Sequence, residues 1–293
     1  MKVGMNLPVM VPGLDRSAIL EWARRIDAGP FTSLCAGERI NFPNPEILIT
    51  LSAAAAVTER VRIVPTVFVL PLHPPVLMAK RIATLDVLSA GRVVLGIGVG
   101  ARRDDFVAAC AVFDAHKLTR MEECVAIMRR VWAGTYIVEG AERAAEPTPV
   151  QPGGPEILVG ALTAPSIRRA ARYADGLCGF SFRPAEDEVR FAWDTARAAW
   201  RAANRDQPPR LTTSFWYALG PRARAQLDEY LHRYLNFMGA DAARALAPTV
   251  QTTSAAALRD ALKMLADLGT DEVFLVPTTA DPDEVHRVAD IIG

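Results

Sequence analysis

Paired cysteines and clustered positive charge are both missing from this sequence. The four cysteines, Cys35, Cys110, Cys124 and Cys178, are scattered without any C-x-x-C pair, which argues against a disulfide framework or a zinc site. We therefore expect reduced thiols and no bound metal. The 33 Lys and Arg residues equal the 33 Asp and Glu residues in number, so no basic field exists to attract nucleic acid or an anionic membrane.

Long hydrophobic runs are also absent. No apolar run approaches the ~20 residues that a membrane span needs, and residues 1–6 turn polar too soon for a secretory signal. We therefore expect a cytoplasmic protein that makes no membrane contact. The chain has 293 residues, of which 51% are hydrophobic, and that is enough for one large core, although length alone also allows two smaller domains.

What the sequence does contain is a repeated alternation of short β-rich and longer helical segments, which is typical of βαβ units and a parallel sheet. The expected strands are residues 2–7, 31–36, 61–70, 92–99, 156–159, 176–180, 211–219 and 272–276. The expected helices are 15–28, 45–59, 74–88, 119–132, 164–174, 185–203, 223–237, 240–247, 254–268 and 282–292.

Eight such strands predict an α/β fold of the (β/α)8 TIM-barrel type, with 1–293 as a single domain. Irregular excursions are expected at about 101–118 and 134–155. A doubly wound open sheet is the alternative, but the G-x-G-x-x-G fingerprint that would mark it is missing from the first strand–helix turn, residues 6–10.

In a barrel of this type, functional residues lie where the strands end, at the C-terminal face. None of the four lysines, Lys2, Lys80, Lys117 and Lys263, falls at such a place, which argues against Schiff-base chemistry. The charge run 102–105 follows the fourth strand and would either cap the mouth or form a solvated surface. Trp216 and Tyr217, near the end of the seventh strand, would line a substrate cavity or pack in the core.

Residues 61–100 carry the most specific pattern. In this segment the sequence resembles the bacterial luciferase-like family of flavin and deazaflavin oxidoreductases, and segments 31–38 and 168–176 support the resemblance. The matching pieces, in order, are Leu70-Pro71, His73-Pro74, Ala79-Lys80, Thr84-Leu85-Asp86, Ser89-Ala90-Gly91-Arg92 and Leu95-Gly96-Ile97-Gly98-Val99-Gly100.

The resemblance implies a cofactor, FMN or the deazaflavin coenzyme F-420, bound at the strand ends. A non-prolyl cis peptide often supports the cofactor ring from behind in this family, and the matching bond is Thr66–Val67. The ring edge or tail would lie against Gly98, Val99, Gly100 and Ala101.

The cofactor phosphate would lie at the turn after the fifth strand. Backbone N–H groups and the positive end of a helix dipole suit a phosphate at a helix start. The alternative interpretation is a plain helix cap by Thr163 or Ser166. The residues assigned to the phosphate are Gly160, Ala161, Leu162 and Thr163.

The end of the second strand departs from the family pattern. Deazaflavin-dependent relatives often have an acidic residue followed by histidine there, whereas this chain has Glu38 and Arg39. Arginine keeps its proton at ordinary pH and is a poor general acid, so it would stabilise an anion or form a salt bridge at the rim. His73 is the other candidate for proton transfer, unless it only shapes the turn between two prolines. We take Glu38, Arg39 and His73 as the candidate catalytic residues.

The resemblance implies an oxidoreductase that moves a hydride to or from a small organic substrate. Coenzyme F-420 is slightly favoured by the arginine-rich composition, while FMN would indicate a monooxygenase served by a flavin reductase. A non-catalytic flavin-binding barrel and a non-redox barrel enzyme with a phosphate ligand remain as alternatives. Dimers are common in the family, and helices 45–59 and 74–88 would form the interface.

Overall fold

Short parallel strands form the centre of the fold, and a computed structural model describes them together with all other residues, 1–293. They are hydrogen-bonded in the order β3-β2-β1-β9-β8-β7-β6-β5-β4. There are nine numbered strands because β3 and β4 are two pieces of one strand. The bridge between Ile63 and Val93 closes the barrel beside β5. The strands are β1 (Lys2–Asn6), β2 (Ser33–Ala36), β3 (Arg62–Pro65), β4 (Phe68–Val69), β5 (Val94–Gly98), β6 (Glu156–Val159), β7 (Gly176–Cys178), β8 (Arg210–Tyr217) and β9 (Glu272–Pro277).

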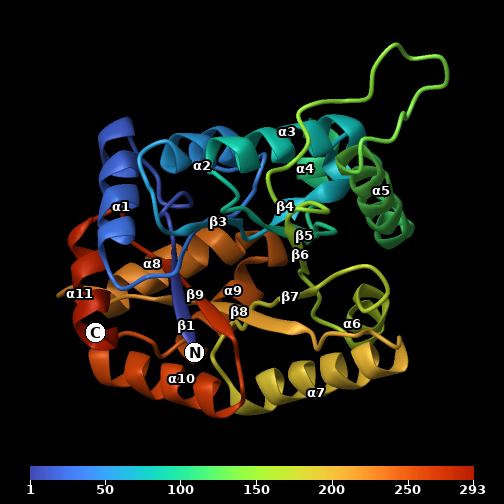
Figure 1. Cartoon of the computed structure of the whole chain (residues 1–293). Helices are drawn as coiled ribbons and strands as arrows, with labels where there is room; N and C mark the ends of the chain where they lie inside the picture. The colour runs from blue at the N-terminus through green and yellow to red at the C-terminus, as the bar shows by residue number, and fades with distance from the viewer.

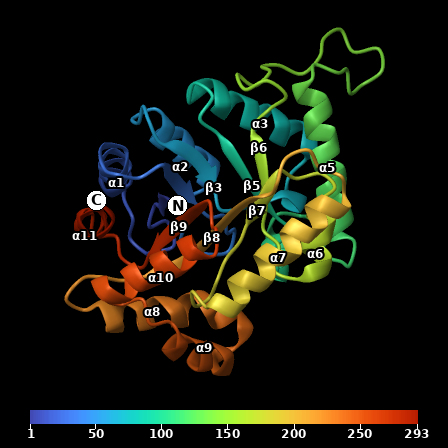
Figure 2. The ribbon, with the colours of Figure 1, turned by 60° about the horizontal axis from the view of Figure 1, so that its bottom comes forward.

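Helices surround the barrel, as Figures 1 and 2 show. This arrangement confirms the predicted TIM-barrel fold. The α-helices are α1 (Arg16–Ala28), α2 (Ile47–Ala55), α3 (Pro75–Leu88), α4 (Arg103–Ala108), α5 (Lys117–Trp132), α6 (Ala164–Ala170), α7 (Glu186–Ala202), α8 (Ala223–Leu235), α9 (Ala240–Leu246), α10 (Ala255–Asp267) and α11 (Asp283–Ile292). Three short 3-10 helices are η1 (Leu70–Leu72), η2 (Asn236–Met238) and η3 (Ala247–Thr249).

Two sequence expectations need correction. Residues 61–70 are not one continuous strand, because the chain leaves the β ladder at Thr66–Val67 and the Val69 N–H donates to the Glu38 carboxylate instead of a strand. The stretch 101–118 is not irregular throughout, since it contains α4 and the start of α5. The stretch 134–155 has no helix or strand, as expected, and projects from the helical ring in Figure 1.

The interior of the barrel is layered, because alternate residues of each strand point inward. The middle layer contains Cys35, Val64, Val94, Leu158, Cys178 and Phe274. Burial raises the pKa of both thiols, to about 12 for Cys178, so they remain neutral and fill space as small apolar groups.

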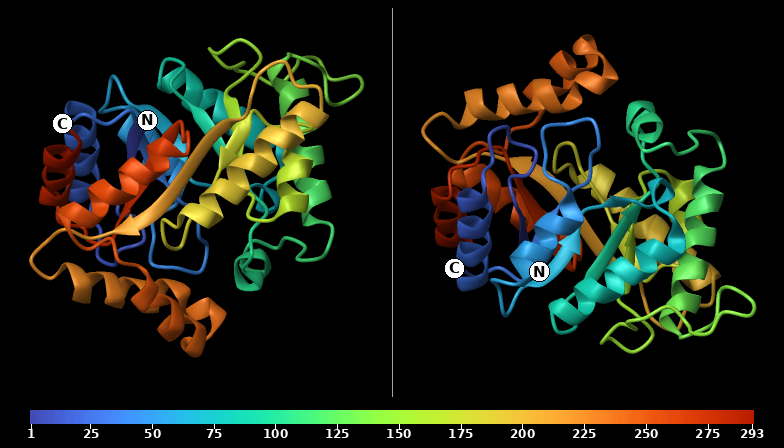
Figure 3. Two further views of the ribbon diagram at one scale, coloured as in Figure 1. Left: turned by 90° about the horizontal axis from the view of Figure 1, so that it is seen from below. Right: turned by 90° about the horizontal axis from the view of Figure 1, so that it is seen from above.

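The segment between β8 and α10 forms a helical hairpin rather than a single barrel helix. In Figure 3, α8 and α9 lie beyond one end of the barrel, apart from the surrounding ring of helices. Tyr234 of α8 packs edge-on against Phe42 of the β2–α2 loop, with ring centroids 5.8 Å apart. Because that loop follows a strand end, the hairpin lies at the C-terminal mouth. No helix of the structure is long and apolar enough to cross a membrane.

Candidate active site

The uppermost inward-facing layer of the barrel forms a mouth with two unlike sides. By strand alternation, Gly37, Gly98 and Gly160 follow the inward residues of β2, β5 and β6 at this level. Beside β6, Phe180 follows β7 and packs against Trp216 of β8, with ring centroids 4.5 Å apart. The mouth therefore has a floor of small residues and, next to it, an aromatic wall.

The glycines of the floor differ in how closely other atoms approach the place where a Cβ would lie. A Cβ on Gly98 would lie 2.7 Å from Val67 Cγ2, and one on Gly100 would lie 2.5 Å from Val69 Cγ1 at a φ of +71°. These two glycines are therefore required by the packing of the chain itself. A Cβ on Gly160 would lie in ordinary van der Waals contact, 3.5 Å from the Ile97 carbonyl oxygen, so no clash requires glycine at this position.

The peptide bond Thr66–Val67 is cis, which confirms the expectation for this bond. Neighbouring strands hold the segment by hydrogen bonds. The Thr66 hydroxyl donates to Asn6 Oδ1 over 2.6 Å, and the Asn6 amide donates to the Leu275 carbonyl over 3.2 Å. The Glu38 N–H donates to the Val67 carbonyl over 3.4 Å. Asn6, which sequence reasoning did not assign to the site, thus ties β1, β9 and the β3–β4 break together.

In the turn from Gly160 to Thr163, one residue caps α6 and two backbone N–H groups have no acceptor. Thr163 caps α6 by accepting from the Ser166 N–H, and the Thr163 N–H donates to the Ser166 hydroxyl over 3.2 Å. This is the alternative interpretation of the turn, a helix cap. The N–H groups of Ala161 and Leu162 have no acceptor within the chain, so two donors at this turn are available to a ligand.

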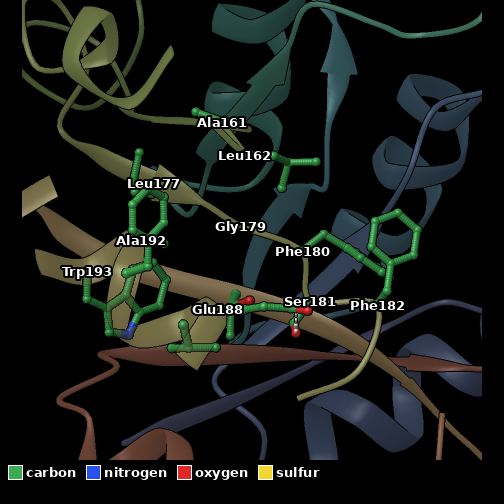
Figure 4. Close-up of a pocket in the computed structure, with 13 residues that line it drawn as sticks. Ala161, Leu162, Leu177, Gly179, Phe180, Ser181, Phe182, Glu188, Ala192 and Trp193 are labelled. Atoms are coloured by element: carbon green, nitrogen blue, oxygen red, sulfur yellow. Dashed lines mark hydrogen bonds between the residues drawn. The ribbon is translucent and has the colours of Figure 1, made fainter. Parts of the chain in front are cut away.

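A cavity of about 250 Å³ opens beside this turn. Ala161 and Leu162 form one edge, and Phe180 and Phe182 lie together at one end with their ring centroids 5.7 Å apart (Figure 4). Helix α7 contributes the opposite side through Trp193 and its neighbours. Nine of the 13 lining residues are hydrophobic, so the cavity suits an apolar part of a ligand whose polar end meets the turn.

Glu38 and His73 lie together at the end of β2. His73 Nε2 is 2.9 Å from Glu38 Oε1, and the Val69 N–H donates to Glu38 Oε2 over 2.7 Å. The carboxylate side chain is 4% exposed and the imidazole 13%. Both Glu38 oxygens are therefore engaged by the protein, and the pair can share a proton through a single contact.

Arg39 is not part of the Glu38–His73 pair. Its side chain turns to α4, where Nε donates to Asp105 Oδ2 over 2.9 Å. Asp105 also accepts from the N–H groups of Ile40 and Asn41. Asp105 was not among the candidates from sequence, although the charge run 102–105 was the signal that could have identified it. That run is a mouth element and not only a solvated surface, because Asp105 is buried.

A family model and a curated relative both match this chain. A family model described as luciferase-like monooxygenase matches residues 1–292. An uncharacterized protein of Mycobacterium tuberculosis is 34% identical over 170 residues, which cover 56% of this chain and 58% of that protein. The chain thus spans little more than half the length of this curated relative.

Two solved structures share the fold over nearly their whole length. An F420-dependent secondary alcohol dehydrogenase in complex with an F420-acetone adduct has a TM-score of 0.80 at 16% identity, covering 99% of this chain and 98% of that one. The oxygenating constituent of 3,6-diketocamphane monooxygenase from Pseudomonas putida, in complex with FMN, has a TM-score of 0.74 at 19% identity. That match covers 100% of this chain and 96% of the other. At these identities the likeness shows the fold alone.

Proposed function

This chain belongs to the luciferase-like monooxygenase family, and on that basis we propose that it is a two-electron oxidoreductase. The cofactor is coenzyme F-420 or FMN, bound at the C-terminal mouth of the barrel. The substrate is a small organic molecule that enters between the cofactor and the aromatic wall. The observation that carries the proposal is the surface without a side chain at Gly160, beside the unused N–H groups of Ala161 and Leu162.

The residues of the mouth fit a flat cofactor with a phosphate. Val67 and Gly160, which has no side chain, leave a surface of small groups against which a ring can lie. The unused N–H donors at Ala161 and Leu162 match the acceptor oxygens of a phosphate. Val99 and Ala101, on either side of Gly100, complete the edge of the mouth nearest the ring.

The protein's contribution to the chemistry is orientation, exclusion of water and control of one proton. When bound, the cofactor supplies the site that gives or takes a hydride. Asn6 and Glu38 hold the Thr66–Val67 segment in place. The His73 imidazole lies 2.9 Å from Glu38, which orients its ring, and would hold or pass the proton of the reaction. Arg39 is held by Asp105 and lies outside this pair.

The family leaves the choice of cofactor between the two compounds named above. FMN would make the enzyme a monooxygenase with a flavin reductase as partner. Coenzyme F-420, slightly favoured by the arginine-rich composition, would make it a dehydrogenase or reductase. The two structural neighbours are one of each kind, an F420-dependent dehydrogenase and a monooxygenase constituent in complex with FMN.

A paired titration tests the proposal. The apo-protein is titrated with FMN and with coenzyme F-420, and cofactor fluorescence is followed. Binding in the micromolar range or tighter by one compound, equivalent to about 8 kcal/mol, assigns the cofactor. If neither binds, the redox proposal fails and a non-redox barrel enzyme becomes the better interpretation. Binding without turnover of any reducible substrate would favour the non-catalytic flavin-binding barrel.

We also propose that the protein forms a homodimer through α2 and α3. Ile49 of α2 is 72% exposed, and Leu77 and Leu88 of α3 are 43% and 59% exposed. Together these side chains give two adjacent helices an apolar outer surface, which suits an interface. Light scattering of the wild type and of Ile49→Glu would give a dimer and a monomer, respectively, if this surface is the interface.

A further inference from the structure

The positive charge of two arginine side chains at the mouth is only partly balanced by nearby carboxylates. Arg39 follows β2, and Arg102 occupies the N-cap position of α4. The Arg39 side chain is only 8% exposed. Arg39 Nη1 and Arg102 Nε are both buried and have no hydrogen-bond acceptor in the protein. Buried donors without partners are rare in folded proteins because they lose hydration without compensation.

Asp105 is the one carboxylate that contacts this pair. It accepts from Arg39 Nε over 2.9 Å, and its other oxygen is shared by the N–H groups of Ile40 and Asn41. Arg102 forms no salt bridge with it, so two guanidinium groups face a single negative charge. Burial lowers the pKa of Arg102, with a smaller contribution from the charge of Arg39, whereas Tyr234 and Asp105 act in the opposite direction. A guanidinium nevertheless keeps its proton, so the excess charge calls for an anion.

Aromatic rings hold the flat faces of both guanidinium groups. Arg39 Cζ lies 4.7 Å from the centre of the Phe42 ring, and Arg102 Cζ lies 3.9 Å from that of Phe237 and 5.1 Å from that of Tyr234. Stacking of this kind occupies the faces of a guanidinium and leaves its N–H edges for an anion. The arginines are therefore positioned by rings and not by counter-ions.

The same rings continue into the aromatic wall of the mouth. Tyr234 packs against Trp216, with ring centroids 5.5 Å apart, and Trp216 packs against Phe180 at 4.5 Å. Trp216 itself is buried, so a ligand that reaches the arginines from the barrel axis meets the half-buried rings of Phe180 and Tyr234, which both pack against Trp216. A body that is flat and apolar, with an anionic group at its end, matches both features.

We propose that the substrate is an organic carboxylate, with its anionic group bound by Arg39 and Arg102 and its apolar body against the half-buried rings of Phe180 and Tyr234. This inference rests on the proposed function, because it assigns the substrate class of the same mouth. The two arginines select the substrate by charge, while the Glu38–His73 pair remains free for proton transfer. A neutral molecule of the same shape would leave the two buried N–H groups unpaired and would bind more weakly.

The test uses the cofactor-loaded protein and benzoate as the probe, with benzamide as its neutral counterpart, in calorimetric titrations. Benzoate should bind at least about tenfold more tightly than benzamide. Arg102→Gln should remove about tenfold or more of the benzoate affinity and leave that of benzamide unchanged. Arg102 has no ion pair to lose, which makes this variant a milder change than one at Arg39. The matched control is Arg103→Gln, which removes an exposed charge from the next residue and should keep full benzoate binding.

Three results would overturn the proposal. Equal binding of benzoate and benzamide would show that no charge selection exists. Equal loss in Arg102→Gln and Arg103→Gln would show a general effect of net charge and not a site. A loss of cofactor affinity in Arg102→Gln, measured in parallel, would mean that the anion belongs to the cofactor. Failure of the wild type to bind either cofactor would instead count against the proposed function, while the same benzoate titrations on the apo-protein would still test the arginine pair.

Discussion

The two ends of the barrel differ in whether their buried charged groups have partners within the protein. At the N-terminal end, Glu272 is fully buried, and its carboxylate accepts from Thr32, Ser33, Arg62 and Arg210. At the C-terminal mouth, Arg39 pairs with Asp105, Arg102 has no carboxylate partner, and each keeps a buried nitrogen without an acceptor. Both ends contain buried charged groups, but only the first satisfies them within the protein.

The difference separates residues that stabilise the fold from residues that await a ligand. In the N-terminal network Arg62 and Arg210 are balanced by Glu156 and Glu272, with no charge left over. A network that is complete without a ligand has a structural role, and barrels of this type place their functional residues at the other end. At the mouth, buried donors lack acceptors, so a bound ligand should stabilise the protein most there.

The largest expected effect is at the N-terminal end. Glu272→Gln removes the charge that two arginines share, and breaking a buried ion pair from one side costs roughly 3–5 kcal/mol. Urea unfolding followed by circular dichroism should show this loss, while the cofactor affinity of the remaining folded protein should be unchanged. A stability close to that of the wild type would mean that the network contributes nothing and would remove the contrast between the two ends.

A smaller loss is expected from the packed part of the mouth. Gly98→Ala places a methyl group 2.7 Å from Val67 Cγ2, and overpacking of this kind costs about 1–3 kcal/mol. The double variant with Val67→Ala should recover part of the stability because it removes the clashing atoms. If the single variant unfolds like the wild type, Gly98 is not required by packing.

Removal of a mouth charge should cost the least stability. Arg102→Gln removes a buried cation that has no ion pair, along with stacking on Tyr234 and Phe237. We expect the free energy of unfolding to change by about 1 kcal/mol or less, in contrast to the effect of Glu272→Gln in the same assay. A loss as large as that of Glu272→Gln would assign Arg102 a structural role instead.

Thiol reactivity should distinguish the exposed rim from the barrel interior. Cys110 is exposed, whereas burial raises the pKa of Cys35 and Cys178 and therefore lowers their thiolate fraction at neutral pH. Cys124 is half-buried, and burial also raises its pKa. A thiol reagent should label Cys110 first, Cys124 more slowly, and the two interior thiols only after unfolding. Early labelling of Cys178 would show that the barrel interior opens.

The strand–helix alternation predicted the barrel well, because each buried strand and each amphipathic helix has its own local pattern. The same reasoning missed α4, whose six residues are too few to show a helical period. It also missed the break after Pro65, which depends on contacts with Glu38 from another strand. The cis bond at Thr66–Val67 was predicted only through resemblance to a family.

The site could be predicted only in part for the same reason. Strand ends can be located from sequence, so Glu38 and Gly160 could be named as candidates. The partnership of Arg39 with Asp105 joins residues that are 66 positions apart, and the stacking of Arg102 on Tyr234 joins the start of α4 to α8. Such contacts are decided by tertiary packing, and no local pattern marks them.

The most direct test of the central claim is the affinity of the cofactor for Gly160→Leu. A Cβ at this position would lie in ordinary van der Waals contact with its neighbours, the nearest at 3.5 Å, so the stability of the variant is measured beside its cofactor affinity. If the cofactor lies on this floor, the affinity for FMN or coenzyme F-420, whichever the wild type binds, should fall by at least about thirtyfold, or ~2 kcal/mol. An unchanged affinity in a variant with wild-type stability would contradict the account, because the cofactor would then have to bind elsewhere.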